Sequence, residues 1–243
     1  MQRARSLLAC AALATLVAAC SSGSGSPASL TGKSPVEVLN AASAAATAVG
    51  STHYVLTETA GNQTQTITGD ATTTDGRQSI STGTVHVQVV LVHGVAYVQG
   101  SAGGLGAALG FSANVAKAYA GRWIAVGSAD SPYGSIVQAV TLNGTISELR
   151  PTGRLSLAGT AIIGGRSALG VKGGLPGQIP SGVSGSTTLY VASSRPTVPL
   201  KFTAHASRGS QTIDDVGTFT AWGQPVHLSA PAGFVAFSSV RSD

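Results

Sequence analysis

Side chains able to do acid–base or metal chemistry are few and scattered along this chain. Nine aspartates and glutamates and five histidines are spread over 243 residues. The histidines follow no helical zinc-binding spacing, and no cysteine ligands accompany them. We therefore expect no metal site, and we expect most histidines on surface strands or in turns. The five histidines are His53, His86, His93, His205 and His227.

Motifs typical of catalysis or nucleotide binding are also missing. Asp214 and Asp215 are adjacent, so on a strand they would point to opposite faces and could not form an acid–base couple. A solvated turn or loop is the predicted setting for this pair. The segment 182–185 does not complete a Gly-x-Ser-x-Gly elbow, and the glycines of 103–110 miss the dinucleotide-binding spacing. We expect a protein that is not an enzyme.

The composition narrows the class of protein further. Only 9% of the residues are charged, against ~25% in ordinary domains, and 43% are hydrophobic. This excludes a chain disordered by charge, and no apolar stretch approaches the ~20 residues of a membrane-spanning helix. The basic residues are dispersed and not interleaved with aromatics, so nucleic-acid binding is not expected either.

The N-terminus has the three-part form of a secretory signal. Arg3 and Arg5 precede an apolar run over 7–17, and small residues then lead to Cys20. This ending resembles a bacterial lipobox, in which the cysteine becomes diacylated and anchors the mature protein to the membrane. We therefore predict a signal peptide over 1–19 and lipidation at Cys20, with the protein on the extracytoplasmic face of the cell membrane. The alternative is a simple secretory signal with an incidental cysteine.

Removing the signal changes the charge and leaves a tether. Without residues 1–19, twelve basic and nine acidic side chains remain, a net charge of +3. The segment 20–33 is rich in Ser, Gly and Pro and is predicted to be a flexible linker. The folded domain is then expected over 34–243.

The domain begins with a helix signal and continues as strands. Ser34, Pro35 and Glu37 form a capping-box start, which predicts a helix over about 35–49. Helices are also expected at 112–120, 131–140 and 142–149, and a glycine-rich loop at 101–110. Strands are expected at 53–59, 63–70, 77–81, 85–92, 95–99, 122–126, 154–163, 166–172, 187–193, 200–206, 211–220 and 226–228.

This order of elements predicts one α+β domain. A large, curved antiparallel sheet would carry its helices on one side, and small side chains could leave a cavity between the two layers. Ala, Gly, Val, Ser and Thr dominate the chain, whereas Phe occurs five times and Met once. Such a cavity would suit a flexible apolar ligand. A solid core is the other outcome that the pattern allows.

Several segments, taken in order, resemble the LppX/LprAFG family of actinobacterial lipoproteins. The resemblance implies a LolA/LolB-like half-barrel of about 10–11 strands with helices on its concave face. It also implies binding of a lipid or acylated glycolipid in an apolar cavity, transport of that lipid within the cell envelope, no catalytic residues and no cofactor. The segments that carry the resemblance are Lys33–Leu39, Gly50–Thr57, Gly94–Val98, Tyr119–Ile124 and Phe219–Val226.

The expected ligand site is an apolar lining without a sequence motif. We expect a monomer whose partners are the lipid ligand and the membrane, with an envelope transporter left open as a protein partner. The alternative is a structural or interaction lipoprotein of the envelope that binds no lipid. The predicted lining residues are Val87, Val89, Leu91, Tyr97, Val137, Leu142, Ile146, Leu189, Val191 and Phe202.

Overall fold

The fold is taken from a computed structural model, which describes residues 30–177 and 180–240. Cys20, the predicted signal peptide and most of the predicted linker lie outside the described residues. The domain starts where the capping box predicts, because α1 begins at Pro35 and ends at Val49. Among the described residues, no helix is long and apolar enough to cross a membrane.

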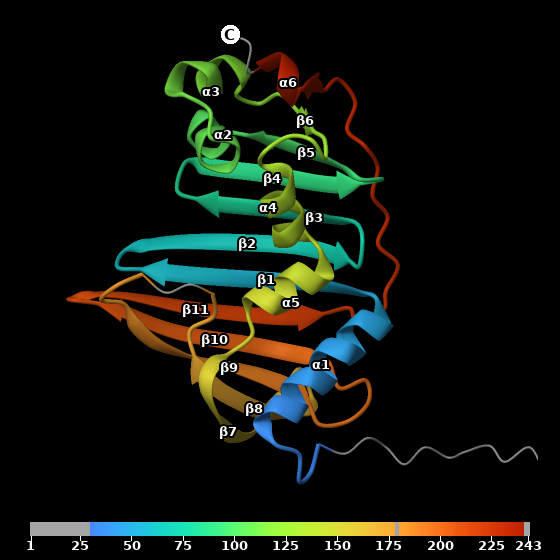
Figure 1. The fold of residues 1–243 in the computed structure, drawn as a ribbon, viewed down its shortest axis with the longest axis vertical. Coiled ribbons are helices and arrows are strands. Elements are labelled where there is room, and N and C mark those ends of the chain that lie inside the picture. Colours follow the sequence, from blue (N-terminus) through green and yellow to red (C-terminus); the bar gives the residue numbers. More distant parts are fainter. Residues whose placement is uncertain (1–29, 178–179, 241–243) are drawn as a thin grey trace, which may run out of the picture.

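Twelve strands form one open, curved sheet (Figure 1). Their order is β12-β6-β5-β4-β3-β2-β1-β11-β10-β9-β8-β7, and all neighbours are antiparallel except β12 and β6, which are parallel. The predicted half-barrel is confirmed, with slightly more strands than expected and one parallel pair. The strands are β1 (Ser51–Ala60), β2 (Gln63–Thr72), β3 (Gly76–Thr82), β4 (Val85–Val92), β5 (Val95–Gly100), β6 (Ile124–Val126), β7 (Thr152–Ile163), β8 (Arg166–Gly174), β9 (Ser184–Ala192), β10 (Pro199–Arg208), β11 (Gln211–Thr220) and β12 (Val235–Ala236).

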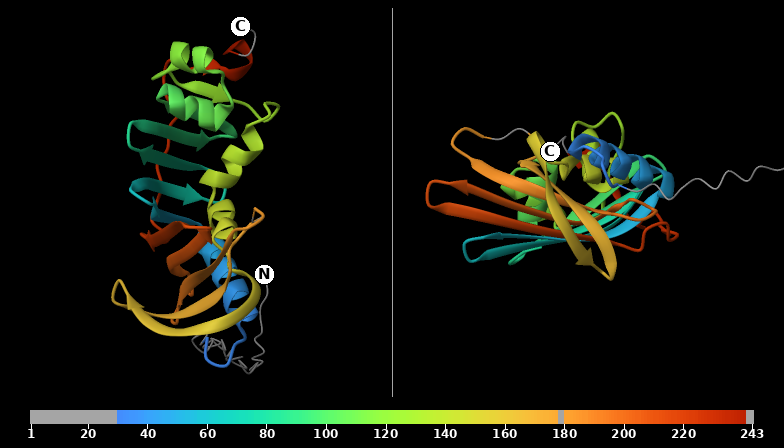
Figure 2. Two further views of the ribbon diagram at one scale, coloured as in Figure 1. Left: turned by 90° about the vertical axis from the view of Figure 1, so that its left-hand side faces the viewer. Right: turned by 90° about the horizontal axis from the view of Figure 1, so that it is seen from below.

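The helices lie mainly on one face of this sheet. In Figures 1 and 2, α1, α5 and α4 follow one another diagonally across that face, which we call the inner face. The opposite face is called the outer face. At the β5–β6 end of the sheet, α2, α3 and α6 gather around the last strands. The remaining helices are α2 (Ala102–Leu109), α3 (Ala113–Tyr119), α4 (Tyr133–Val140), α5 (Leu142–Glu148) and α6 (Phe237–Val240).

Helix α1 shows how local sequence signals and burial agree. The Ser34 hydroxyl accepts from the Glu37 backbone N–H, and the Glu37 carboxylate accepts from the Ser34 backbone N–H. Gly50 ends the helix in the left-handed conformation at φ 85°. The buried face of α1 packs on the sheet and consists of Val38, Leu39, Ala42 and Ala46. The helix is therefore fixed both at its ends and along its apolar face.

Two of the expected elements differ in the structure. The glycine-rich segment 101–110 is helix α2, because Ser101 caps it and the buried Leu105 and Leu109 hold it against the sheet. Packing therefore outweighs the low helix propensity of glycine. The segment 226–228 is not a strand. It belongs to residues 221–234, which we call the strap. The strap leaves β11 and runs past the ends of the strands to reach β12 (Figure 1).

The core is divided between the two ends of the sheet. One cluster joins α1 and α5 to β1 and β8–β11, with Leu39, Leu142 and Phe202 among its members. A second joins α2, α4 and α6 to β4–β6, with Leu105 and Ile124 among its members. The boundary between these clusters, near β3 and β4, is where an open space remains.

Candidate functional site

An apolar hollow opens on the inner face between β3 and β4 and the helices α2 and α4. We call it the β4 pocket. Its volume is about 320 Å³, within the range of ~300–1,000 Å³ that ligand sites occupy. Its lining is Gln65, Gln78, Ile80, Thr82, Val85, Val87, Val89, Gly104, Ala107, Ala108, Ser135, Ile136, Ala139 and Val140.

Strand register gives this pocket a deep end and a rim. On the inner face Gln78 pairs with Val89, Ile80 with Val87, and Thr82 with Val85. Val89 is 6% exposed whereas Val85 is 41% exposed, so the pocket deepens toward Gln78. Thr82 lies four positions after Gln78 on β3, a length of about 13 Å at ~3.3 Å per residue. The pocket is therefore a short channel along the strands.

A buried hydrogen-bond network closes the deep end. The Gln78 side-chain Nε2 donates to the Tyr54 hydroxyl at 3.0 Å and to the Ala139 carbonyl at 3.5 Å. The Thr145 hydroxyl donates to the same carbonyl at 3.4 Å, which ties α5 to α4. Burial raises the pKa of Tyr54 to about 12, so its hydroxyl keeps its proton at neutral pH.

Two glycines make room for this network. A Cβ at Gly69 would overlap the ring and hydroxyl of Tyr54, which lies across β2 at that point. A Cβ at Gly76 would overlap the backbone carbonyl of Val140, the last residue of α4. Tyr54 and the end of α4 can approach the sheet this closely only because glycine has no side chain at these two positions.

The lining of the β4 pocket carries no charged side chain. The ion pairs of the described residues lie on the outer face, where Asp70 bonds His53 at 2.7 Å and Arg77 at 2.6 Å. Burial raises the pKa of Asp70, but these hydrogen bonds outweigh burial and hold it below its ordinary value. Another pair, His205 with Asp214, is exposed on the same face. The pocket itself offers apolar contact and neutral hydrogen bonds.

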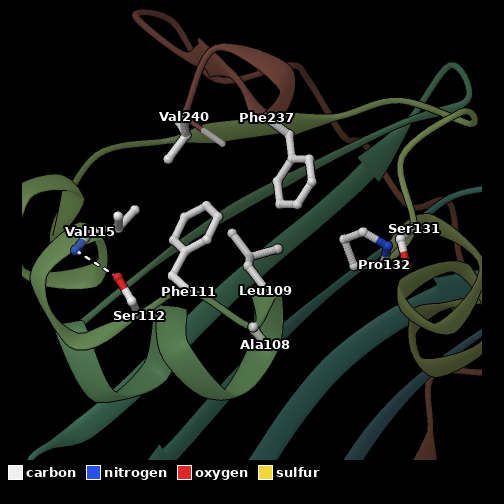
Figure 3. Close-up of a pocket in the computed structure, with 10 residues that line it drawn as sticks. Ala108, Leu109, Phe111, Ser112, Val115, Ser131, Pro132, Phe237 and Val240 are labelled. Atoms are coloured by element: carbon white, nitrogen blue, oxygen red, sulfur yellow. Dashed lines mark hydrogen bonds between the residues drawn. The ribbon is translucent and has the colours of Figure 1, made fainter. Parts of the chain in front are cut away.

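A second apolar hollow lies on the other side of α2. Its volume is about 470 Å³, and Ala108 of α2 lines both hollows. Figure 3 shows Leu109, Phe111 and Val115 on one side of it and Phe237 and Val240 of α6 on the other. The rings of Phe111 and Phe237 stack with centroids 5.6 Å apart. Helix α2 thus separates two apolar spaces.

A third hollow, larger than these two, has different chemistry. It measures about 660 Å³ and lies between the β1–β2 and β10–β11 turns. Gln63, Arg208 and Gln211 on its wall are exposed. An apolar ligand there would cover these polar and charged groups without pairing them, so the smaller, uncharged β4 pocket is the better candidate site.

The structure divides the predicted lining residues among three places. Val87 and Val89 lie on the wall of the β4 pocket, and Leu91 is buried in the adjoining core. Val137 of α4 packs against that core without lining the pocket. Tyr97 lies on the outer face, where its ring meets Phe234 of the strap at 5.2 Å.

Five predicted lining residues lie in packed core. They are within the cluster beneath α1 and α5, where Leu39 and other side chains of α1 fill the space above the sheet. They are Leu142, Ile146, Leu189, Val191 and Phe202. Gln78, Ile80 and Ile136 also line the pocket and were not predicted from the sequence. The alternation of residues along the strand 77–81 places Gln78 and Ile80 on the same face. This pattern could have predicted that the two side chains line one site.

No protein-family model and no curated protein sequence matches this chain. LprF from Mycobacterium bovis is 17% identical, with a TM-score of 0.49 over 82% of this chain and 97% of that one. LppX from Mycobacterium tuberculosis is 16% identical, with a TM-score of 0.48 over 80% and 98%. The MucA/MucB complex of Pseudomonas aeruginosa is 15% identical, with a TM-score of 0.38 over 76% and 55%.

Asp215 is an unusual acid on the inner face, outside the β4 pocket. The expectation of a turn or loop for this pair was wrong, since Asp214 and Asp215 lie within β11 and face opposite sides of the sheet. Asp215 pairs with Glu58 of β1, and its Oδ1 is enclosed without a hydrogen-bond partner among the described residues. Burial raises the pKa of Asp215 to about 6, with smaller contributions from Glu58 and Asp214.

This raised pKa predicts a pH-dependent stability. The folded state binds the Asp215 proton more tightly than the unfolded chain, so stability should fall as pH rises from about 4 to about 6 and then level off. Asp215→Asn should therefore raise the free energy of unfolding at pH 7.5 by about 1 kcal/mol, after discounting for partial exposure. Urea unfolding at pH 4.5 and 7.5 measures the difference. Glu58→Gln should give part of this gain in the free energy of unfolding, because Glu58 contributes to the raised pKa. If Asp215→Asn changes the free energy of unfolding equally at both pH values, the raised pKa of Asp215 is contradicted.

Proposed function

We propose that this protein binds the alkyl portion of a lipid in the β4 pocket and carries that lipid within the cell envelope. The observation that carries the proposal is the pocket's lining, which is mainly apolar, uncharged and open at the rim. Each Å² of apolar ligand surface buried there contributes roughly 25 cal/mol. The groups around the pocket bind and position a ligand, and we propose no catalytic step.

The sequence supports the location of this activity. A lipidated Cys20 would hold the domain at the extracytoplasmic face of the membrane, and the segment 20–33 would let it reach a lipid bilayer. LppX, to which the fold is similar, is a lipoprotein, but the proposed ligand rests on the pocket. A structural lipoprotein without a lipid ligand is the alternative.

Mass spectrometry of the full chain, purified from membranes, tests the proposal. Under native conditions we expect an added lipid mass that is absent under denaturing conditions, whereas the covalent acyl groups at Cys20 persist in both. Organic extraction should release that lipid for identification. A chain whose native and denatured masses agree, and which takes up no alkyl probe, supports the structural alternative and overturns the proposal.

A further inference from the structure

The β4 pocket holds a polar group at its closed end. Its four polar side chains are Gln65, Gln78, Thr82 and Ser135, and none is charged. Gln78 is 9% exposed and lies at the deep end, whereas Ser135 is exposed and Thr82 lies toward the rim. A ligand filling the pocket therefore places one end of its alkyl segment beside the Gln78 amide.

The hydrogen bonds of Gln78 fix what its amide can offer. Nε2 faces the Ala139 carbonyl, which can only accept, so the amide nitrogen and not its oxygen lies on that side. Both N–H groups are then directed to protein, one to Ala139 and one to the Tyr54 hydroxyl. The remaining atom is Oε1, an acceptor, which receives no hydrogen bond from the described residues. Gln78 presents an acceptor to a ligand.

We infer that Gln78 is a specificity-determining residue that selects neutral alkyl ligands carrying a hydroxyl group. This rests on the proposed function. A hydroxyl can donate to Oε1, whereas an ionised carboxylate or phosphate has only acceptors and finds no cation in the lining. An alkyl group without a donor would cover Oε1 without pairing it, which is unfavourable. The ligand class is therefore a hydroxylated alkyl or acyl chain without charge at that end.

Isomeric probes test this inference. 1-Octanol and 1-methoxyheptane have the same atoms and differ in the hydroxyl donor, and octanoate adds the charge. With the full chain in one detergent, competition with a fluorescent apolar dye gives the three dissociation constants. We expect 1-octanol to bind about five- to tenfold more tightly than 1-methoxyheptane, as one hydrogen bond allows, and octanoate to bind most weakly. In the Gln78→Met variant, the ratio of the dissociation constants of 1-methoxyheptane and 1-octanol should fall to about one.

Gln88→Met is the matched control, because Gln88 is a glutamine on the neighbouring strand β4 that is exposed on the outer face, away from the pocket. It should keep the isomer ratio of the unmodified protein. Should Gln78→Met not fold, a crystal structure with 1-octanol decides, and its hydroxyl is expected within hydrogen-bond distance of Gln78 Oε1. Equal affinities in the unmodified protein, or an unchanged ratio in Gln78→Met, overturn the inference alone. Failure of every alkyl probe to bind overturns the proposed function as well.

Discussion

Replacing Ile80 with tryptophan should lower the affinity for an alkyl ligand at least about tenfold while leaving the domain folded. Ile80 is half-buried in the middle of the channel, between the levels of Gln78 and Thr82 on β3. It borders open space, so a larger ring extends into the pocket instead of into packed core. The indole would occupy the volume that the ligand needs.

Ser79→Trp is the control for this substitution. Ser79 is the neighbour of Ile80 on the same strand but is exposed on the outer face, so the same residue is added without filling the pocket. Titration with 1-octanol should show a normal affinity for Ser79→Trp and a large loss for Ile80→Trp. Thermal unfolding of both variants checks that each is folded. Unchanged binding by a folded Ile80→Trp variant would place the ligand elsewhere.

The second large effect is expected at Gly76. Its Cα faces the Val140 carbonyl so closely that an added methyl group must displace the end of α4. Overpacking of this kind costs about 1–3 kcal/mol, and we expect Gly76→Ala near the upper limit because the obstacle is backbone. Affinity for an alkyl ligand should fall too, because α4 supplies Ile136 and Ala139 to the pocket.

Gly134 provides the opposite test on the same helix. It lies in α4 with no atom near the position of an added Cβ, and its φ is not in the left-handed region. Gly134→Ala should therefore stabilise the domain by up to about 1 kcal/mol through helix propensity. Urea unfolding of both variants measures the contrast. A Gly76→Ala variant as stable as the unmodified protein contradicts the close approach of α4 to β3.

Local signals predicted the elements well where they were unambiguous. The capping box at Ser34 and Glu37 placed α1, and alternation with short turns placed β1–β5. These features depend on neighbours within a few residues, so sequence alone contains them. Helix α2 was missed because its stability comes from Leu105 and Leu109 in the core, which outweighs its glycines.

The pocket was harder to predict because it depends on which helix covers which part of the sheet. Val87 and Leu189 are both apolar, inner-face strand residues, yet one borders open space and the other is beneath α1 and α5. The alternation of side chains along a strand does not distinguish Val87 from Leu189. Tyr97 shows another limit, since Ala96, Tyr97 and Val98 are all buried and burial alone does not distinguish the two faces of β5. The strap residue Phe234, 137 positions later, covers the outer face at Tyr97.

The occupied position of an alkyl ligand tests the account most directly. We would crystallise the full chain with 8-bromo-1-octanol and locate the bromine from its anomalous scattering. We predict a bromine peak toward the rim of the β4 pocket, near Thr82 and Val85, with the hydroxyl end at Gln78. A peak only in the hollow between α2 and α6, or only at the polar turns near Arg208, would contradict it.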